Sequence, residues 1–512
     1  MKKNFKVIIL NIVLFILLLI FFLRVCPVIP FDGDDWYFSG SMRMPIPLWK
    51  VFNPIKVLPE VLEPLGGYIG AYLIYPITND YVGAIAVVQA FIIAVFGISL
   101  FYMFYKYVCI KYNKNEIEGL IYEIIFALSF FLIFKTSGRK SYYGFWASDL
   151  NCYFNYIIPG ILNACLVLLM DRYDNFIEEF KKWDYIKKGF FILAMYFAIF
   201  SSIQLSIILS LYCSWKVIEK IVKTLKNEKK FNWKKILKGT EVYFLELIVW
   251  IISLIYEKNG SRALAIANNN WLTFDNINYV FSNFKALYRN TNKLLIVLSA
   301  ISIINILLHF NCDKEKEDKM RLKILETLIK NIYFIVLTFI YLFLLYLNAG
   351  GHYAGRVDAT WALIFFILLF INSCIVLSFE LMPRFKVAFP MIISIMLLIT
   401  VNMNNRFEQS VFDYSKAKQI DNNIIKQIIE ADREGKTYIE VQVPRYKNEE
   451  QNWPQPYNMA IWLQNTLYAH NIIKNRIKIV FIPSDELYEM FYKKDEGTYE
   501  NYFDFESGRY IE

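Results

Sequence analysis

Two observations predict an all-α polytopic membrane protein of about eleven transmembrane helices, followed by a small C-terminal α/β domain. The chain has 512 residues, of which 56% are hydrophobic, and its mean hydropathy is +0.35. Its apolar residues come in runs that are long enough to cross roughly 30 Å of hydrocarbon, with charged segments between them. A soluble protein would be less apolar and would gather these residues in one or two cores. A soluble fold is therefore excluded.

The first apolar run follows a basic N-terminus. Residues 1–6 contain three lysines, and residues 7–23 form an apolar stretch in which Asn11 is the one polar residue. A cleaved signal peptide would have a shorter apolar core and a small-residue cleavage site. Here the stretch is followed by Arg24-Val25-Cys26-Pro27, so we expect an uncleaved first span.

Ten further apolar runs have the length of membrane spans. Two of them, at 188–203 and 205–222, are separated only by Ser201-Ser202-Ile203-Gln204. This stretch is either a tight turn between two spans or a polar break in a re-entrant element. The remaining runs lie at 81–105, 119–135, 156–171, 240–257, 293–310, 329–347, 359–379 and 386–403.

The distribution of basic residues predicts the orientation. With the N-terminus in the cytoplasm, the cytoplasmic loops hold 25 Lys or Arg in 79 residues, and the outer loops hold 13 in 125. Membrane proteins concentrate Lys and Arg on the cytoplasmic side, and here their density is about threefold higher there. An odd number of spans then places the C-terminus outside. The outer loops of this transmembrane domain, 1–403, are 24–80, 135–155, 258–293 and 348–358.

The C-terminal segment, 404–512, has a different composition. It carries 14 basic and 18 acidic residues, and isoleucines recur at helical spacing between positions 420 and 429. Residues 438–443 and 477–482 read as strands that are each closed by a proline, and 457–471 reads as a helix. We expect a small soluble extracytoplasmic α/β domain.

Several site classes find no support in the composition. The net charge is +9, but no segment interleaves basic and aromatic residues, so we expect no nucleic-acid partner. The seven cysteines lack CxxC spacing and the three histidines are far apart, so no metal site is predicted. The expected partner is the lipid bilayer.

The four predicted outer loops hold most of the unusual residues. The first opens with Phe31-Asp32-Gly33-Asp34-Asp35-Trp36-Tyr37, about nine residues beyond the first span. We expect the four loops to meet on one face of the membrane, at the depth of the lipid headgroups. A site at that depth can bind a substrate that is attached to a lipid. The others contribute Arg139, Tyr142, Tyr143 and Asp149 from 135–155, Arg262 from 258–293, and His352, Arg356 and Asp358 from 348–358.

The acidic cluster is the strongest candidate for chemistry. Asp32, Asp34 and Asp35 repel one another, so at least one should be more easily protonated or should bind a cation. A carboxylate at the bilayer surface can also take a proton from a hydroxyl nucleophile. The alternative is a solvated acidic turn followed by an interfacial aromatic pair, Trp36 and Tyr37.

With Asp34-Asp35 in the first outer loop, the chain resembles the GT-C superfamily of membrane glycosyltransferases, or a related bacterial multi-pass family with an Asp-Asp-aromatic first outer loop. The resemblance implies a bacterial plasma membrane location. Members take sugars from polyprenyl-phosphate carriers, and their first outer loop carries an acidic motif and amphipathic surface helices. Many end in a soluble outer domain. Segments 44–58 and 60–76, which are broken by prolines, match the position of the surface helices. No second signature, such as Trp-Trp-Asp-Tyr-Gly, is present, so donor and acceptor cannot be carried over.

The resemblance implies transfer of a sugar from a polyprenyl-phosphate donor to an extracytoplasmic glycan or lipid acceptor. Asp34 or Asp35 would be the base, with Asp32, Asp149 and Asp358 as secondary acidic candidates. Guanidinium groups suit the leaving phosphate, and tyrosine or tryptophan rings suit the faces of sugars. A divalent cation, Mg²⁺ or Mn²⁺, would bridge an aspartate to phosphate, although the ligand set is incomplete. The binding candidates are Arg139, Arg262, Arg356, His352, Trp36, Tyr142 and Tyr143.

Other functions compete with transfer. Each arginine is also explained by a headgroup contact, and the aromatic residues by an interfacial belt. A transporter or flippase of lipid-linked saccharides would place charges near the bilayer midplane, where the sequence has only Glu123, Glu246 and Glu241. A polymerase or ligase of such saccharides and a non-catalytic membrane assembly protein also remain open.

Overall fold

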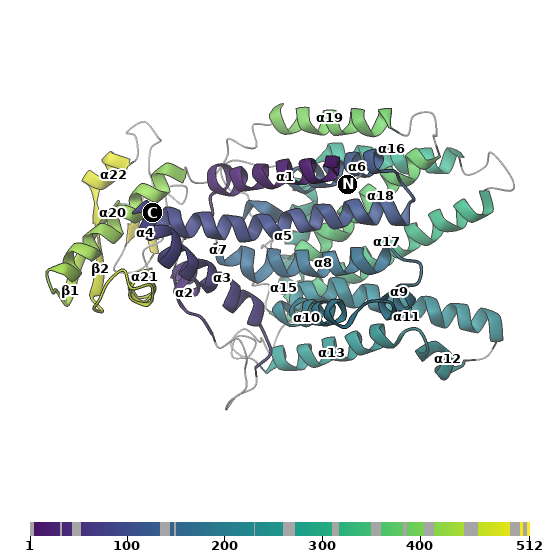
Figure 1. The fold of residues 1–512 in the computed structure, drawn as a ribbon, viewed down its shortest axis with the longest axis horizontal. Helices are drawn as coiled ribbons and strands as arrows, with labels where there is room; N and C mark the ends of the chain where they lie inside the picture. The colour runs from purple at the N-terminus through teal and green to yellow at the C-terminus, as the bar shows by residue number, and fades with distance from the viewer. Residues whose placement is uncertain are drawn as a thin grey trace.

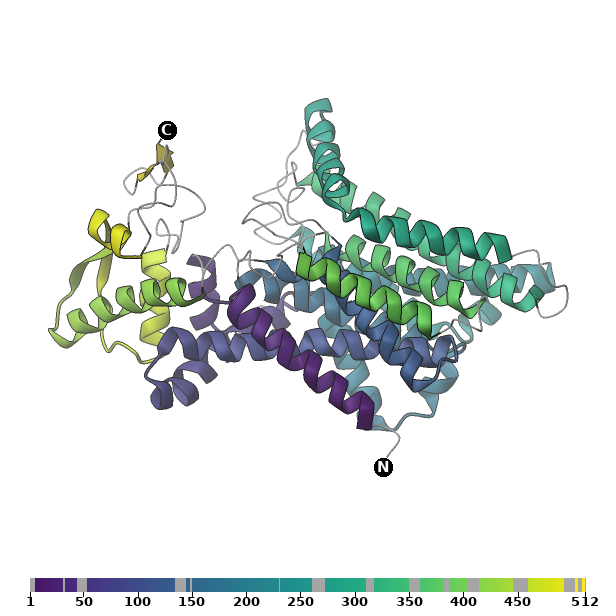
Figure 2. The ribbon, with the colours of Figure 1, turned by 90° about the horizontal axis from the view of Figure 1, so that it is seen from above.

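Helices make up most of the chain (Figure 1). The computed structural model describes residues 5–30, 33–43, 53–133, 144–147, 150–229, 231–259, 272–309, 317–349, 360–381, 387–403, 414–444 and 459–491, and two short strands at 502–504 and 509–511. The long helices lie side by side in one bundle, and the C-terminal segment lies at one end of it (Figures 1 and 2).

Each predicted span coincides with a helix. These helices are α1 (Phe5–Ile20, extended by the π-helix η2, Phe21–Val25), α5 (Tyr81–Lys111), α6 (Glu116–Leu132), α8 (Ile158–Asp171), α10 (Tyr185–Ser201), α11 (Ile203–Glu228), α13 (Glu241–Lys258), α16 (Lys293–His309), α17 (Glu317–Asn348), α18 (Trp361–Glu380) and α19 (Ala388–Met403).

Other elements connect these helices or follow them. They are α2 (Gly33–Gly40), α3 (Val57–Ile69), η3 (Gly70–Ile74), α4 (Tyr75–Thr78), η4 (Gly144–Trp146), α7 (Leu150–Cys152), η5 (Tyr153–Ile157), α9 (Phe176–Lys181), α12 (Trp233–Leu237), α15 (Phe274–Asn290), α20 (Tyr414–Arg433), β1 (Tyr438–Pro444), α21 (Met459–Ala469), β2 (Lys478–Ser484), α22 (Asp485–Phe491), β3 (Tyr502–Asp504) and β4 (Arg509–Ile511).

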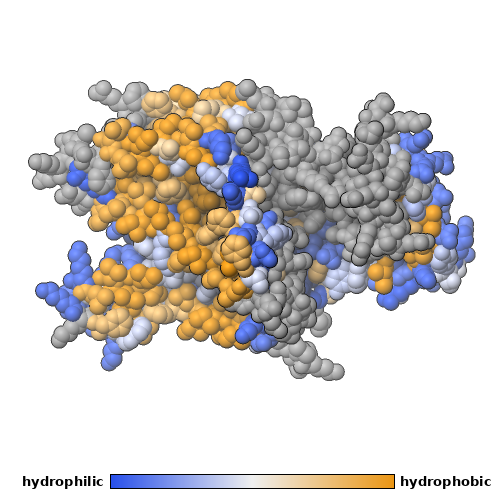
Figure 3. Space-filling view, turned by 180° about the vertical axis from the view of Figure 1, so that it is seen from behind, coloured by the Kyte–Doolittle hydropathy of each residue, from blue (hydrophilic) through white to orange (hydrophobic). Residues whose placement is uncertain are grey.

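The bundle has the character of a membrane protein. Within the described ranges, five helices are long and apolar enough to cross a bilayer, and two shorter ones are strongly apolar. Apolar residues dominate the face of the bundle that Figure 3 shows, apart from the residues drawn in grey, as lipid contact requires. The chain is therefore a predominantly helical membrane protein, while the count of eleven spans stays a prediction. The five are Phe5–Val25, Tyr81–Lys111, Leu150–Asp171, Arg321–Asn348 and Trp361–Glu380.

The centre of the bundle lies around α18, which is buried along nearly its whole length. Helix α8 approaches it closely at Gly160, where a Cβ atom would stand 2.5 Å from the Trp361 ring. Elsewhere, Ser202 alone separates α10 from α11, with an extended backbone at φ −157° and ψ 127°. These two helices pack on each other, so the break is a tight turn between helices.

The C-terminal segment has strands and helices where the sequence predicts them. Strands β1 and β2 pair in parallel, with Val441 opposite Phe481, and the amphipathic helix α20 packs on β1. Among its described residues, this segment shares its core with the first predicted outer loop, because Trp36, Tyr81 and the C-terminal apolar residues form one cluster. The first predicted outer loop and the C-terminal segment are therefore one packed unit. Its extracytoplasmic location stays a prediction.

Candidate functional site

The acidic pair of the first predicted outer loop lies on helix α2. Residues 33–35 are helical, so the acidic turn considered above is wrong for this part of the chain. The two carboxylates have opposite environments: Asp34 is exposed, and Asp35 is completely buried. Trp36, predicted as a sugar-binding or interfacial residue, is also completely buried.

Asp35 is held by the start of another helix. Its carboxylate accepts the backbone N–H groups of Leu150, at 3.1 Å, and Asn151, at 2.7 Å. These residues begin the continuous helical run Leu150–Asp171. The first N–H groups of a helix lack partners within it, and the positive end of the helix dipole favours an anion. Asp35 is therefore an acceptor for this helix start, supplied by a distant part of the sequence.

The opposite side of α2 packs against α21. The Thr466 hydroxyl donates to the Trp36 carbonyl oxygen. At Gly40 the two backbones come so close that a Cβ atom would lie 2.7 Å from the Thr466 Cα atom. The Trp36 ring stacks on Tyr81, with ring centres 6.5 Å apart. Position 40 consequently needs glycine for close approach.

His470 at the end of α21 completes this contact. Its Nδ1 atom lies 2.6 Å from the Tyr81 hydroxyl, and its Nε2 atom lies 3.1 Å from the Ser39 carbonyl oxygen. Because a carbonyl can only accept, Nε2 carries the proton and Nδ1 accepts from Tyr81. Burial lowers the pKa of His470 to about 4, so the ring is neutral at pH 7.

A second polar contact fixes α20 to the start of α5. Asp80 caps α5 by accepting from the Gly83 N–H group at 3.0 Å, and it also accepts from Lys418 at 2.7 Å and Asn422 at 3.2 Å. Burial would raise the pKa of Asp80, but these hydrogen bonds outweigh it and lower the pKa. The C-terminal segment is thus tied to α2 and to α5.

Most predicted site residues lie outside the described residues. Among the acidic and binding candidates, the structure describes only Asp34, Asp35 and Trp36. Trp146 and Tyr153, two further aromatic residues of the second predicted outer loop, are also described, and both are buried. The residues outside the description are Asp32, Arg139, Tyr142, Tyr143, Asp149, Arg262, His352, Arg356 and Asp358.

The described flanks of the predicted outer loops are joined to one another. The Asp35 contact brings the first loop to the end of 135–155. The Asn292 N–H donates to the Ile133 carbonyl at 2.7 Å, which joins the end of 258–293 to the start of 135–155. The Asn276 side chain donates to the Leu347 carbonyl at 3.0 Å, beside the start of 348–358.

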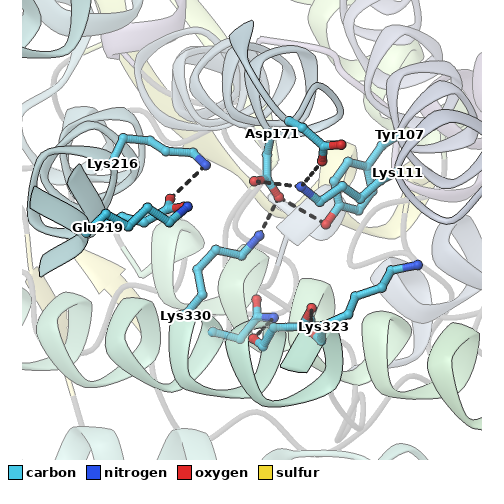
Figure 4. Close-up of polar contacts among 11 residues, drawn as sticks. Tyr107, Lys111, Asp171, Lys216, Glu219, Lys323 and Lys330 are labelled. Carbon is cyan, nitrogen blue, oxygen red and sulfur yellow. Dashed lines mark hydrogen bonds and ion pairs between the residues drawn. The ribbon is translucent and has the colours of Figure 1, made fainter. Parts of the chain in front are cut away.

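A buried ion network lies at the other end of the bundle (Figure 4). Asp171, at the end of α8, pairs with Lys330 of α17 and accepts from the Tyr107 hydroxyl at 3.1 Å. Lys111 lies 3.9 Å from the second carboxylate oxygen. Asp171 is 3% exposed and Lys330 is 6% exposed, so this pair is cut off from water.

Neither this network nor the His470 contact was predicted from the sequence. Asp171 and Lys330 lie at the ends of predicted apolar runs, where a charged residue ordinarily marks the boundary of a span. His470 reads as an isolated histidine. Two features of the sequence could have indicated these contacts. One is Lys330, which lies inside the apolar run 329–347, and the other is the set of polar residues on the otherwise apolar helix predicted at 457–471.

The described residues contain no group of three His, Cys, Asp or Glu side chains that could hold a metal ion. A divalent cation therefore stays a prediction that would involve residues outside the description. No protein-family profile, curated protein or solved structure matches the chain. The residues of the candidate site are therefore the only basis for a proposed function.

Proposed function

We propose that the chain is a membrane glycosyltransferase that moves a sugar from a polyprenyl-phosphate carrier to an extracytoplasmic acceptor, a glycan or a lipid. The observation that supports this most is the joining of the four loop flanks, the first through α2, the helix that carries the exposed Asp34. Loops anchored in this way would bring their arginines, aromatic residues and carboxylates to one mouth beside the bilayer.

The two aspartates would then have different roles. Asp34, whose side chain is exposed, would take the proton from the acceptor hydroxyl as its oxygen attacks the anomeric carbon. The bond from that carbon to the phosphate oxygen breaks, and the carrier phosphate leaves with the electron pair. Asp35 would position α2 through Leu150 and Asn151. Arg139, Arg262 and Arg356 would bind the phosphate.

The number of spans, the orientation of the chain and the location of the C-terminal segment are also part of what we propose. Eleven spans, a cytoplasmic N-terminus and an extracytoplasmic C-terminal α/β unit would place the Asp34 site on the outer side of a bacterial plasma membrane. The C-terminal segment would recognise the acceptor, because α21 covers one side of α2.

The proposal is tested with purified protein in lipid vesicles. A panel of polyprenyl-phosphate sugars is added with candidate acceptors, and release of the carrier phosphate is measured with and without Mg²⁺ or Mn²⁺. Release that depends on an acceptor and is lost in Asp34→Asn is expected. Release from none of the donors, or release unaffected by Asp34→Asn, would contradict the assignment.

Transport of a lipid-linked saccharide is the second candidate, and the buried Asp171–Lys330 pair favours it. Charged groups buried within a helical membrane bundle are costly and commonly mark a substrate or ion pathway. From the sequence alone, transport was disfavoured because few ionisable residues lie inside the apolar runs. Movement of a fluorescent polyprenyl-phosphate sugar between leaflets, lost in Lys330→Gln and retained in Asp34→Asn, would favour transport over transfer.

A further inference from the structure

The first helix stands partly away from the bundle. Figure 2 shows α1 crossing the bundle obliquely, and of its residues only Val7 and Leu18 are buried. Between the N-terminal half of α1 and the C-terminal half of α5 lies an open-sided groove of about 560 Å³. This groove is at the end of the bundle farther from α2 and the C-terminal segment.

The walls of the groove are mainly apolar. On α1 they extend from Val7 to Phe15, and on the antiparallel α5 from Ile98 to Lys106. Eight residues of helix are about 12 Å long, which is close to the roughly 15 Å depth of one leaflet. Ile8 is 55% exposed, so the groove faces the surroundings of the bundle. Its length and lining suit one hydrocarbon chain.

The groove has a positively charged end. The ammonium group of Lys106 lies 5.3 Å from the centre of the Tyr102 ring and 5.4 Å from that of Tyr105. Within the described part of the chain, no carboxylate lies at ion-pair distance from Lys106. Lys6, which is exposed, directly precedes the groove residue Val7. A cation at one end of an apolar groove, with a second cation one residue before the lining begins on α1, complements an anionic headgroup that is joined to a hydrocarbon chain.

The only amide along the groove does not offset this charge. Asn11 donates to the Val7 carbonyl oxygen at 2.9 Å, so part of its polarity is satisfied within α1. The buried Glu123 carboxyl lies behind Asn11, on the side of α6, and does not line the groove. An incoming phosphate would therefore meet Lys106 and Lys6 first.

We infer that the groove between α1 and α5 binds an anionic phospholipid, with an acyl chain along the groove and its phosphate at Lys106. The bound lipid comes from the leaflet at the N-terminal side of α1. The inference does not depend on sugar transfer, because the groove and Asp34 lie at opposite ends of the bundle.

Native mass spectrometry of the full chain tests this site. The detergent-purified protein is titrated with phosphatidylglycerol or phosphatidylcholine that carry the same acyl chains. The expected result is retention of one phosphatidylglycerol per chain in preference to phosphatidylcholine. Lys106→Gln should reduce that preference about fivefold, since a cation at a lipid headgroup contributes a factor of this size. The matched control is Lys226→Gln, which removes an exposed lysine of α11 and should leave the preference unchanged.

A second pair of variants tests the apolar part. Ser99→Trp fills the groove and should abolish retention of both lipids, whereas Leu344→Trp, on an exposed site of α17, should not. Thermal melting in detergent confirms that each variant is folded. Equal retention of the two lipids by the unaltered protein, or an unchanged preference in Lys106→Gln, would overturn the inference. A dimer that Ser99→Trp abolishes would overturn it too, because it would assign the groove to a second copy.

Discussion

The carboxylate of Asp35 accepts the backbone N–H of Asn151 at 2.7 Å, across 116 positions of sequence. The adjacent Leu150 N–H donates to the same carboxylate. The contact shows that the two adjacent aspartates of α2 have different roles, which the sequence alone does not reveal. Asp35 anchors a helix start, and Asp34 faces outward.

Replacing the two aspartates should therefore give different defects. Asp34→Asn keeps the fold and removes the proposed base, so turnover should fall about 10²–10⁴-fold with donor binding retained. Asp35→Ala leaves the buried N–H groups of Leu150 and Asn151 without an acceptor, and should lower stability by about 1–3 kcal/mol. Thermal melting and carrier-phosphate release distinguish the two effects. Normal transfer by Asp34→Asn would move the base to Asp149 or Asp358.

The predicted orientation can be tested by cysteine labelling in intact cells. Cysteine at Ser41 or at Lys426 should react with a membrane-impermeant maleimide, and cysteine at Lys226 should react only after permeabilisation. The physical reason is the threefold higher density of basic residues in the predicted cytoplasmic loops. The unsubstituted protein measures the background from its own cysteines. Labelling at Lys226 in intact cells would reverse the orientation and put Asp34 in the cytoplasm.

The contact between α21 and α2 should weaken in acid. His470 has its pKa lowered to about 4 in the folded protein, against 6.5 in an exposed histidine, so the unfolded state binds the proton more readily. Its contribution to stability is complete above about pH 6.5 and is lost as the pH falls toward 4. The loss reaches about 3 kcal/mol at most, at ~1.4 kcal/mol for each unit.

Melting temperatures measured between pH 7.5 and 4 check this prediction. His470→Gln should lower stability at pH 7.5 and flatten its dependence on pH, because glutamine does not titrate. His309→Gln, which changes a histidine of α16, is the control and should keep the slope. An unchanged slope in His470→Gln would show that other groups carry the acid sensitivity.

Replacing Asp171 and replacing Lys330, the two members of the buried ion pair, should lower the stability of the protein by different amounts. After Lys330→Gln, Asp171 keeps Lys111 at 3.9 Å and the Tyr107 hydroxyl. After Asp171→Asn, Lys330 has no carboxylate partner among the described residues, and an uncompensated buried charge costs about 3–5 kcal/mol. Asp171→Asn should thus lower the melting temperature more than Lys330→Gln. The double variant should recover part of the loss, and purely additive losses would show that the two charges are not coupled.

That the chain is a membrane protein could be predicted from its sequence, because the hydrocarbon core of a bilayer excludes polar segments. Each spanning helix must be apolar over about 30 Å, so its position appears as a run in one stretch of chain. Strands β1 and β2 were found for a similar reason, since each shows an apolar pattern that ends at a proline. These features depend on neighbouring residues. The ends of both strands were predicted to within two positions, whereas some helices extend well beyond the predicted runs, as α17 does by beginning at Glu317.

The roles of particular polar residues depended on the tertiary structure. Asp35 finds its partners 115 and 116 positions away, and His470 contacts Tyr81 across 389 positions, so neither contact leaves a local pattern. The same holds for Asp171 and Lys330, which the sequence places at the edges of separate runs and the bundle buries together. The sequence by itself determined which segments are apolar enough to enter a bilayer. Only the folded chain decided which charged groups are buried, because burial of a charge requires a partner brought from elsewhere in the chain.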